Sequence, residues 1–118
     1  MNKKIFDRYI LDTVTHEVSG PYNIIEVSRL LLNNPLLTCD DYLILKDHVG
    51  DLIVTTTFRG IDINRFDDDV LPQFFETKVD GKDWPVKICE SYLLAVHAHW
   101  EIVDHIGMQK NEKLLIRI

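Results

Sequence analysis

The period of the apolar side chains changes after residue 41, and this change constrains the fold more than any other feature of the sequence. Residues 42–45 and 52–58 are rich in β-forming residues, and a short loop with Gly50 and Asp51 precedes the second run. Two such runs around a glycine-containing loop predict a β-hairpin. The three consecutive threonines at 55–57 are β-branched and fit a pleated strand better than a helix. We therefore expect antiparallel sheet.

The segments before this hairpin predict a strand, a turn and a helix. Residues 6–11 favour a short strand, and residues 15–22 favour a turn because they contain a Gly-Pro pair. Residues 24–31 place apolar side chains at i, i+3, i+6 and i+7, which is the spacing of one helical face. Asn23 is the expected N-cap of this helix, and Pro35 follows its end.

The segments after the hairpin predict two more strands and a second helix. Residues 73–79 and 114–118 favour strands, and a helix is expected over residues 92–106. Ser91 is the expected cap of this helix, and Gly107 fits the position that ends it. The expected apolar stripe comprises Leu93, Val96, Trp100, Val103 and Ile106, widened by Tyr92, Ala95, His99 and Ile102.

These elements define the fold class. With 118 residues the chain has room for one domain, which we place over residues 1–118. Two helices are too few for an all-helical domain of this length, and adjacent strands with short turns favour antiparallel pairing. The prediction is an α+β fold, a small antiparallel sheet of about four strands with two helices packed on one face.

The charge balance excludes several classes of function. Acidic residues number 19 and basic residues 13, so the net charge is −6. Binding to nucleic acid depends on Lys and Arg, and direct nucleic-acid binding is therefore not expected.

No apolar run approaches the ~20 residues of a membrane-spanning helix, and the N-terminus lacks the apolar core of a signal peptide. We expect a cytoplasmic protein with no membrane contact and no cofactor.

Cysteine and histidine spacings do not predict a metal centre. Cys39 and Cys89 fit neither a disulfide framework nor a zinc motif, and we expect them to be small buried side chains. His97, Glu101 and His105 lie at i, i+4 and i+8, but i and i+8 are about 12 Å apart along a straight helix. One zinc ion cannot bridge that distance, so we interpret this face as a solvated polar face.

A cluster of carboxylates indicates a binding surface. Four aspartates lie between residues 62 and 69, without the spacing of a calcium-binding loop. A charged rim around an aromatic anchor is common in protein interfaces. The predicted partner-binding residues are Asp62, Phe66, Asp67, Asp68, Asp69 and Glu76.

An alternative interpretation places chemistry in a pocket. His99 lies on the flank of the apolar stripe of the second helix, where a carboxylate could orient it as a general base. Glu76 interrupts an apolar strand, and Asp62 precedes that strand. This alternative predicts a small-ligand pocket lined by Asp62, Glu76 and His99.

Several short motifs occur in the order that a known family shows. They are a strand with a G-I-D turn at residues 50–62, Leu71-Pro72, an F-F-E-T-K-V strand at residues 74–79, Ala98-His99 and Ile102-Val103. In this order they resemble a family of small uncharacterised phage and prophage proteins with a G-[IL]-D turn, an F-E-T strand and a C-terminal helix that contains histidine. Residues 63–66 replace a shorter His- and Gly-containing stretch of that family. The resemblance implies a phage or mobile-element protein that acts inside a bacterial cell.

We therefore expect a protein that binds and modulates a host bacterial protein without catalysis. The expected role is inhibition of a defence system, of the anti-CRISPR or another anti-defence type. In a variant of this hypothesis, the aspartates mimic the phosphates of nucleic acid. Two alternatives stay open: the ligand-binding protein or enzyme described above, and a homo-oligomeric accessory protein whose exposed strand edge pairs with a second copy.

Overall fold

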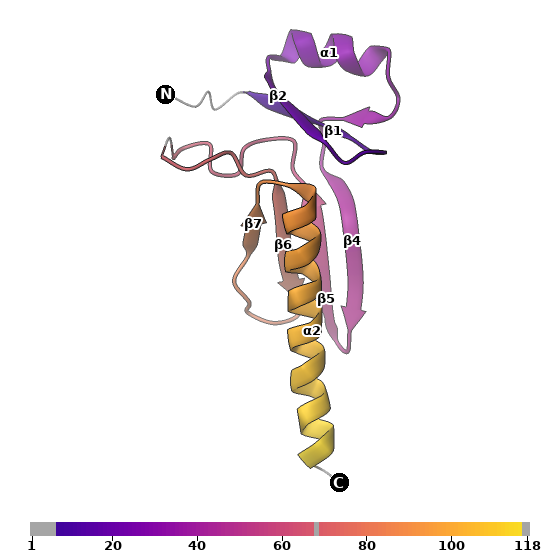
Figure 1. The fold of residues 1–118 in the computed structure, drawn as a ribbon, viewed down its shortest axis with the longest axis vertical. Coiled ribbons are helices and arrows are strands. Elements are labelled where there is room, and N and C mark those ends of the chain that lie inside the picture. Colours follow the sequence, from indigo (N-terminus) through magenta and orange to yellow (C-terminus); the bar gives the residue numbers. More distant parts are fainter. Residues whose placement is uncertain (1–6, 68, 117–118) are drawn as a thin grey trace.

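The computed structural model describes residues 7–67 and 69–116, and of residues 108–116 it describes the backbone alone. Seven strands and two helices follow one another along the described residues (Figure 1). They are β1 (Arg8–Asp12), β2 (Val18–Tyr22), α1 (Ile24–Leu32), β3 (Leu37–Thr38), β4 (Tyr42–Val49), β5 (Leu52–Phe58), β6 (Phe75–Asp80), β7 (Lys87–Cys89) and α2 (Tyr92–Ile116).

The strands form two antiparallel sheets, with the orders β2-β1-β3 and β4-β5-β6-β7. The predicted α+β class and the antiparallel pairing are confirmed, but the strands form two sheets where the sequence predicts one sheet of about four strands. The two sheets each carry one helix, because α1 contacts β1 and β3 whereas α2 contacts all four strands of the larger sheet. Figure 1 shows α2 lying along this sheet and extending beyond its lower end.

The small sheet contains a strand that the sequence does not reveal. Asp12 Oδ1 accepts hydrogen bonds from the backbone N–H groups of Thr15 and Val14, at 3.0 and 2.8 Å. These bonds stabilise the ionised carboxylate and hold the pKa of the Asp12 carboxyl below its usual range. They also stabilise the turn after β1, which spans residues 13–17. Residues 18–22 then form β2, so the prediction of a turn there is wrong. β2 is an edge strand, and an edge strand accommodates proline without losing a ladder hydrogen bond.

Helix α1 begins at its predicted N-cap. Asn23 Oδ1 accepts from the Glu26 N–H at 2.9 Å, and Glu26 Oε1 accepts from the Asn23 N–H at 3.0 Å, which completes a capping box. Val27 is buried, but Ile24, which shares its predicted apolar face, is 65% exposed. The helix contacts only the short strands β1 and β3, and much of its apolar surface therefore faces outward.

The predicted hairpin is confirmed as β4 and β5, which pair from Tyr42↔Phe58 to Val49↔Leu52. Side chains of β5 and β6 alternate between the two sides of the sheet. Val54, Thr56 and Phe58 are buried on the side that α2 covers, which we call the inner face. Thr55 and Thr57 lie on the opposite, outer face. The helix thus covers one side of the sheet, and the other side carries Thr55 and Thr57 beside the apolar Leu43 and Ile53.

Helix α2 starts where the sequence predicts but ends ten residues later, at Ile116 instead of Ile106. Gly107 lies inside it, and the strand predicted at 114–118 is wrong for residues 114–116, while 117–118 lie outside the described residues. Among the side chains described up to residue 107, those buried are Ala95, Ala98, His99 and Ile106. The predicted stripe is thus displaced around the helix, and Leu93 and Trp100 are exposed. Small alanines allow the helix to approach the sheet closely.

One hydrophobic cluster joins the two sheets. It contains Tyr9, Leu11, Phe58, Phe75, Cys89, Ala95 and Ala98, from β1, β5, β6, β7 and α2. The Tyr9 N–H also donates to the carbonyl oxygen of Gly60 at 3.0 Å, directly after β5. The small sheet is therefore held against one end of the larger sheet by apolar packing and by a backbone hydrogen bond.

Candidate functional site

Four polar side chains form a hydrogen-bonded row between α2 and the large sheet. His99 Nε2 lies 2.7 Å from Asp47 Oδ2, and His99 Nδ1 lies 2.7 Å from Thr56 Oγ1. Thr56 Oγ1 is in turn 2.6 Å from Thr77 Oγ1. We call these four residues the polar chain. His99, Thr56 and Thr77 are buried, and Asp47 reaches the surface at the edge of the sheet.

The fold places these residues together by strand register. Thr56 pairs with Thr77 across β5 and β6, and both point to the inner face. Asp47 of β4 pairs with Val54, so its side chain points to the same face. His99 projects from the buried side of α2 onto this row. Four separate elements therefore contribute one residue each.

Hydrogen-bond chemistry sets the direction of the contact between His99 and Asp47, and the charge of the imidazole sets the direction of the others. A carboxylate only accepts, so His99 Nε2 carries a proton and donates to Asp47. In the neutral imidazole, Nδ1 then accepts from the Thr56 hydroxyl, whose oxygen accepts from Thr77. Each of these polar atoms has a hydrogen-bond partner. For this reason the imidazole of His99 can be buried in the apolar interface between α2 and the sheet.

Asp47, His99 and Thr56 have the chemical composition of a nucleophilic triad, but their setting favours structural support. A nucleophile must reach its substrate, and the Thr56 hydroxyl is fully buried between His99 and Thr77. Thr56 lines neither of the two grooves described below. The polar chain therefore fastens α2 to the sheet.

Replacing Thr56 with valine should lower the free energy of unfolding by about 2 kcal/mol. Valine keeps the shape of the side chain but leaves His99 Nδ1 and the Thr77 hydroxyl without their partner. Thr55→Val is the matched control, because Thr55 lies on the outer face, and we expect a change within about 0.5 kcal/mol. Urea unfolding followed by circular dichroism measures both. Equal losses in the two variants would contradict the proposed role of the polar chain.

The predicted pocket of Asp62, Glu76 and His99 is not formed. Glu76 lies between Phe75 and Thr77, which point to the inner face, so Glu76 points to the outer face. His99 lies on the inner face, and the sheet separates the two side chains. The carboxylate beside His99 is Asp47 of β4, which is not among the site residues predicted from the sequence.

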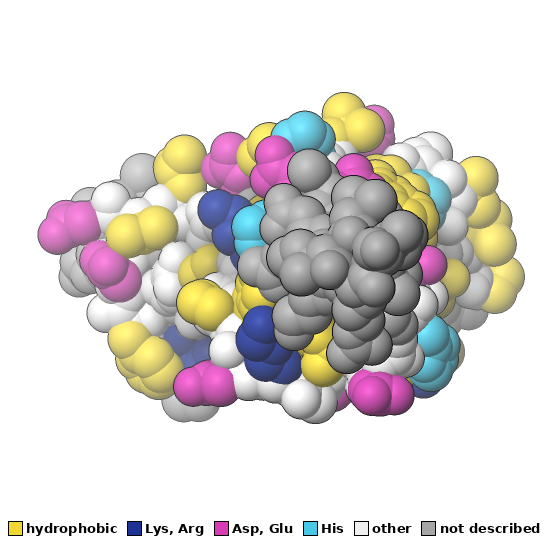
Figure 2. All heavy atoms as spheres, turned by 90° about the horizontal axis from the view of Figure 1, so that it is seen from below, with side chains coloured by type: hydrophobic (Ala, Val, Ile, Leu, Met, Phe, Trp, Pro, Cys, Tyr) yellow, Lys and Arg dark blue, Asp and Glu magenta, His cyan; other side chains and the backbone are white. Residues whose placement is uncertain are grey.

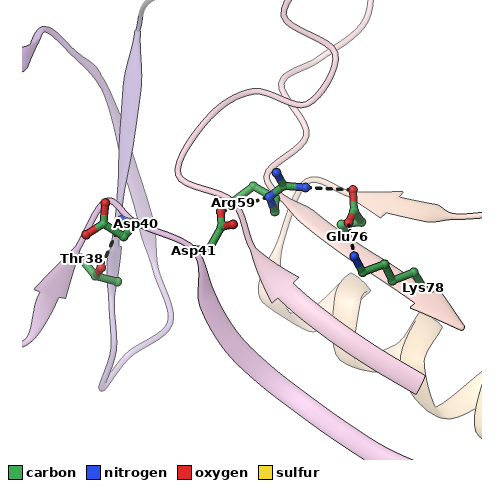
Figure 3. A network of polar contacts seen from close by, with 6 residues as sticks. All are labelled: Thr38, Asp40, Asp41, Arg59, Glu76 and Lys78. Carbon is green, nitrogen blue, oxygen red and sulfur yellow. Dashed lines mark hydrogen bonds and ion pairs between the residues drawn. The ribbon is translucent and has the colours of Figure 1, made fainter. Parts of the chain in front are cut away.

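Glu76 takes part in a network on the outer face (Figure 3). Its Oε2 accepts from Arg59 Nη1 at 3.1 Å, and Lys78 Nζ lies 4.0 Å from Oε1. Arg59 Nε also donates to Asp41 Oδ1 at 3.1 Å. Figure 3 shows Arg59 reaching from the end of β5 to both carboxylates. Glu76 is thus engaged in pairing within the protein and offers little surface to a partner.

Asp62 shapes the loop in which the other aspartates lie. It is only 5% exposed, and its Oδ1 accepts from the backbone N–H groups of Asn64 and Gln73, at 3.0 and 2.9 Å. These bonds hold the start of the loop against its end. Asp62 therefore positions the predicted partner-binding segment and contributes almost none of its surface.

The remaining predicted loop residues are accessible. Phe66 is 76% exposed, with the Arg65 guanidinium 4.8 Å from the centre of its ring. Asp67 and Asp69 are exposed, and Asp67 Oδ1 accepts from the Asp69 N–H at 3.0 Å. Asp68 lies outside the described residues. Figure 2 shows hydrophobic and acidic side chains next to one another at the left end of the molecule, where this loop projects in Figure 1.

An open groove of about 600 Å³ lies between this loop, β7 and α2. We call it the α2 groove. Its apolar lining comes from Val70, Leu71, Ile88, Cys89, Leu94 and Ala98. Its charged and titratable lining comes from Asp69, Lys87, Glu90, His97 and Glu101. The groove thus combines an apolar wall with a predominantly acidic rim, which sequence spacing could not assemble from three separate segments.

A second open groove, of about 610 Å³, meets the first at the N-terminus of α2. Glu90 lines both, and the adjacent Leu94 and Leu93 line the first and the second. Leu93 is 78% exposed and Leu94 49%. We call this pair the leucine ridge. Leu93 belongs to the stripe that the sequence predicts as core, so its exposure is a correction, and it marks this end of α2 as a surface with unusual apolar area.

The histidines on the outside of α2 support the interpretation of a polar face. His97 Nε2 lies 2.9 Å from Glu101 Oε1, and both side chains are exposed. His105 packs edge-on against Trp84, with ring centres 5.6 Å apart. Among the described residues, no group of three or more His, Cys, Asp or Glu side chains is arranged to hold a metal ion.

Both cysteines are free in the structure, and burial raises the pKa of each thiol. Because the thiolate is the reactive form, both should react with a disulfide reagent more slowly at pH 7 than free cysteine does, and faster as the pH rises. Cys39 is half-buried and Cys89 is buried, so Cys39 should react first. Thiol titration of native and urea-unfolded protein measures this. Equal rates in the native protein would contradict the burial of Cys89.

Comparison with known proteins gives no assignment, since no family model, no curated protein and no solved structure matches this chain. Within the part of the chain that the structure describes, no helix combines the length and the apolar character needed to cross a bilayer.

Proposed function

We propose that this chain is a protein-binding module of phage or mobile-element type that modulates a host bacterial protein without catalysis. The observation that carries the proposal is the apolar surface around the N-terminus of α2. The leucine ridge, Leu71 at 69% exposure and Phe66 lie among carboxylates. Exposed aliphatic and aromatic anchors within a charged rim are typical of protein interfaces.

Three further points support the proposal. The triad-like residues are used inside the molecule, where the Thr56 hydroxyl is closed to a substrate. The net charge of −6 favours a partner with a basic surface. The resemblance to small phage and prophage proteins supports a target in a bacterial defence system, in the host cytoplasm.

Site-specific crosslinking in bacterial cells tests the proposal. Benzoylphenylalanine at Phe66 should form an adduct with one host protein, and Leu94→Asp should abolish that adduct because it places a charge on the leucine ridge. The control position is Leu43, an exposed residue of β4 at the opposite edge of the sheet, which should form no such adduct. The absence of any adduct at Phe66 would contradict the proposal, and an adduct between two copies of the chain would favour the homo-oligomer instead.

A further inference from the structure

The α2 groove has a composition that restricts what it can bind. Leu71 and Val70 come from the loop, Cys89 from the inner face of β7, and Leu94 and Ala98 from α2. Their side chains form an apolar wall. A volume of about 600 Å³ falls in the range of sites that bury a small ligand or a few side chains of a partner.

The rim of the groove is unevenly charged. Asp69, Glu90 and Glu101 each come from a different segment, and Lys87 is the single Lys or Arg among the lining residues. His97 lies within 2.9 Å of Glu101 and adds a donor beside that carboxylate. The exposed Asp67 lies two residues from Asp69 on the same loop. An anionic occupant would therefore meet three carboxylates at this rim and would be repelled.

We infer that the α2 groove binds a protein segment that combines Lys or Arg with aliphatic residues. This inference rests on the proposed function and names the chemistry of the partner at the same site. Long basic side chains lay their methylene stems on an apolar wall while their cationic heads reach a carboxylate rim. The pattern disfavours phosphate-bearing partners and anionic lipid surfaces, because the rim carboxylates repel their charge.

A peptide titration tests the inference with defined probes. Isotope-labelled protein is titrated with two peptides of equal length, Ac-Gly-Leu-Lys-Arg-Leu-Gly-amide and Ac-Gly-Leu-Glu-Glu-Leu-Gly-amide, and amide chemical shifts are recorded. The basic peptide should shift the amides of groove residues and bind several-fold more weakly at higher salt, since added salt screens the rim charges. The acidic peptide should produce no shifts at the same concentration.

Charge-reversal variants locate the effect. Glu90→Lys with Glu101→Lys should weaken the basic peptide about tenfold or more, because both carboxylates lie at the rim. Asp51→Lys with Asp80→Lys changes the net charge equally at exposed positions outside the groove and should have little effect. Equal weakening in both variants, equal binding of both peptides, or no shift in groove amides would overturn the inference.

The crosslinking experiment and the peptide titration test different claims, so a negative result in one does not decide the other. A host-protein adduct at Phe66 without peptide binding would leave the proposed function in place and remove this assignment of chemistry. Peptide binding in the groove without a host-protein adduct would retain the chemistry and remove the proposed function.

Discussion

Replacing His99 with alanine should lower the free energy of unfolding by about 3–4 kcal/mol. The substitution removes a fully buried ring and leaves a cavity beneath α2. It also takes away the hydrogen-bond partner that Thr56 and Asp47 share. The cavity and the unsatisfied Thr56 hydroxyl both destabilise the folded state, so the effect should exceed that of Thr56→Val.

His97→Ala is the matched control, two residues earlier on the same helix. His97 is exposed, and its contact with Glu101 is a surface pair of the kind that contributes about 0.5 kcal/mol or less. Urea unfolding of both variants measures the difference. A loss at His99 no larger than that at His97 would show that the polar chain does not hold α2 on the sheet.

Replacing Gly60 with alanine should destabilise the protein by about 3 kcal/mol or more. Gly60 has φ +70°, in the left-handed region, and a Cβ built on it would lie 1.9 Å from the carbonyl oxygen of Cys39. That oxygen belongs to the backbone and cannot move aside as a flexible side chain would. Relief requires a backbone shift that disturbs the Tyr9–Gly60 hydrogen bond between the two sheets.

Gly107→Ala is the control, and we expect it not to destabilise the protein. Gly107 lies within α2, and a Cβ there meets no atom within 4 Å. Alanine favours the helix over glycine by about 0.5–1 kcal/mol, so this variant should be unchanged or more stable. Thermal unfolding of the two variants gives the comparison. A Gly60→Ala protein as stable as Gly107→Ala would contradict the close approach of residues 39 and 60.

The sequence predicts those elements whose signals are local. The hairpin of β4 and β5 follows from β-branched residues on either side of Gly50 and Asp51, and the start of α1 follows from Asn23. β2 is missed because its Gly-Pro pair is typical of a turn, although it lies at a sheet edge. The end of α2 is misplaced because Gly107 is tolerated inside a long helix.

The candidate site depends on contacts that sequence spacing does not encode. Asp47 and His99 are 52 residues apart, and the packing of α2 on the sheet brings them together. A signal for Asp47 does exist: Leu45 and Val49 lie two residues to either side, so strand alternation places this carboxylate on an apolar face. Asp62 was predicted to contact a partner, but its hydrogen bonds to the loop backbone are visible only in three dimensions.

The exterior of the protein binds the partner and the polar chain supports the fold, and capture of the host protein by two variants tests this distinction most directly. Leu94→Asp alters the leucine ridge at little expected cost to folding, whereas Thr56→Val weakens the polar chain and leaves the surface unchanged. At a temperature where both variants are folded, Thr56→Val should retain the host protein at the level of the unsubstituted chain, and Leu94→Asp should lose it. Retention by Leu94→Asp together with loss by folded Thr56→Val would contradict the account.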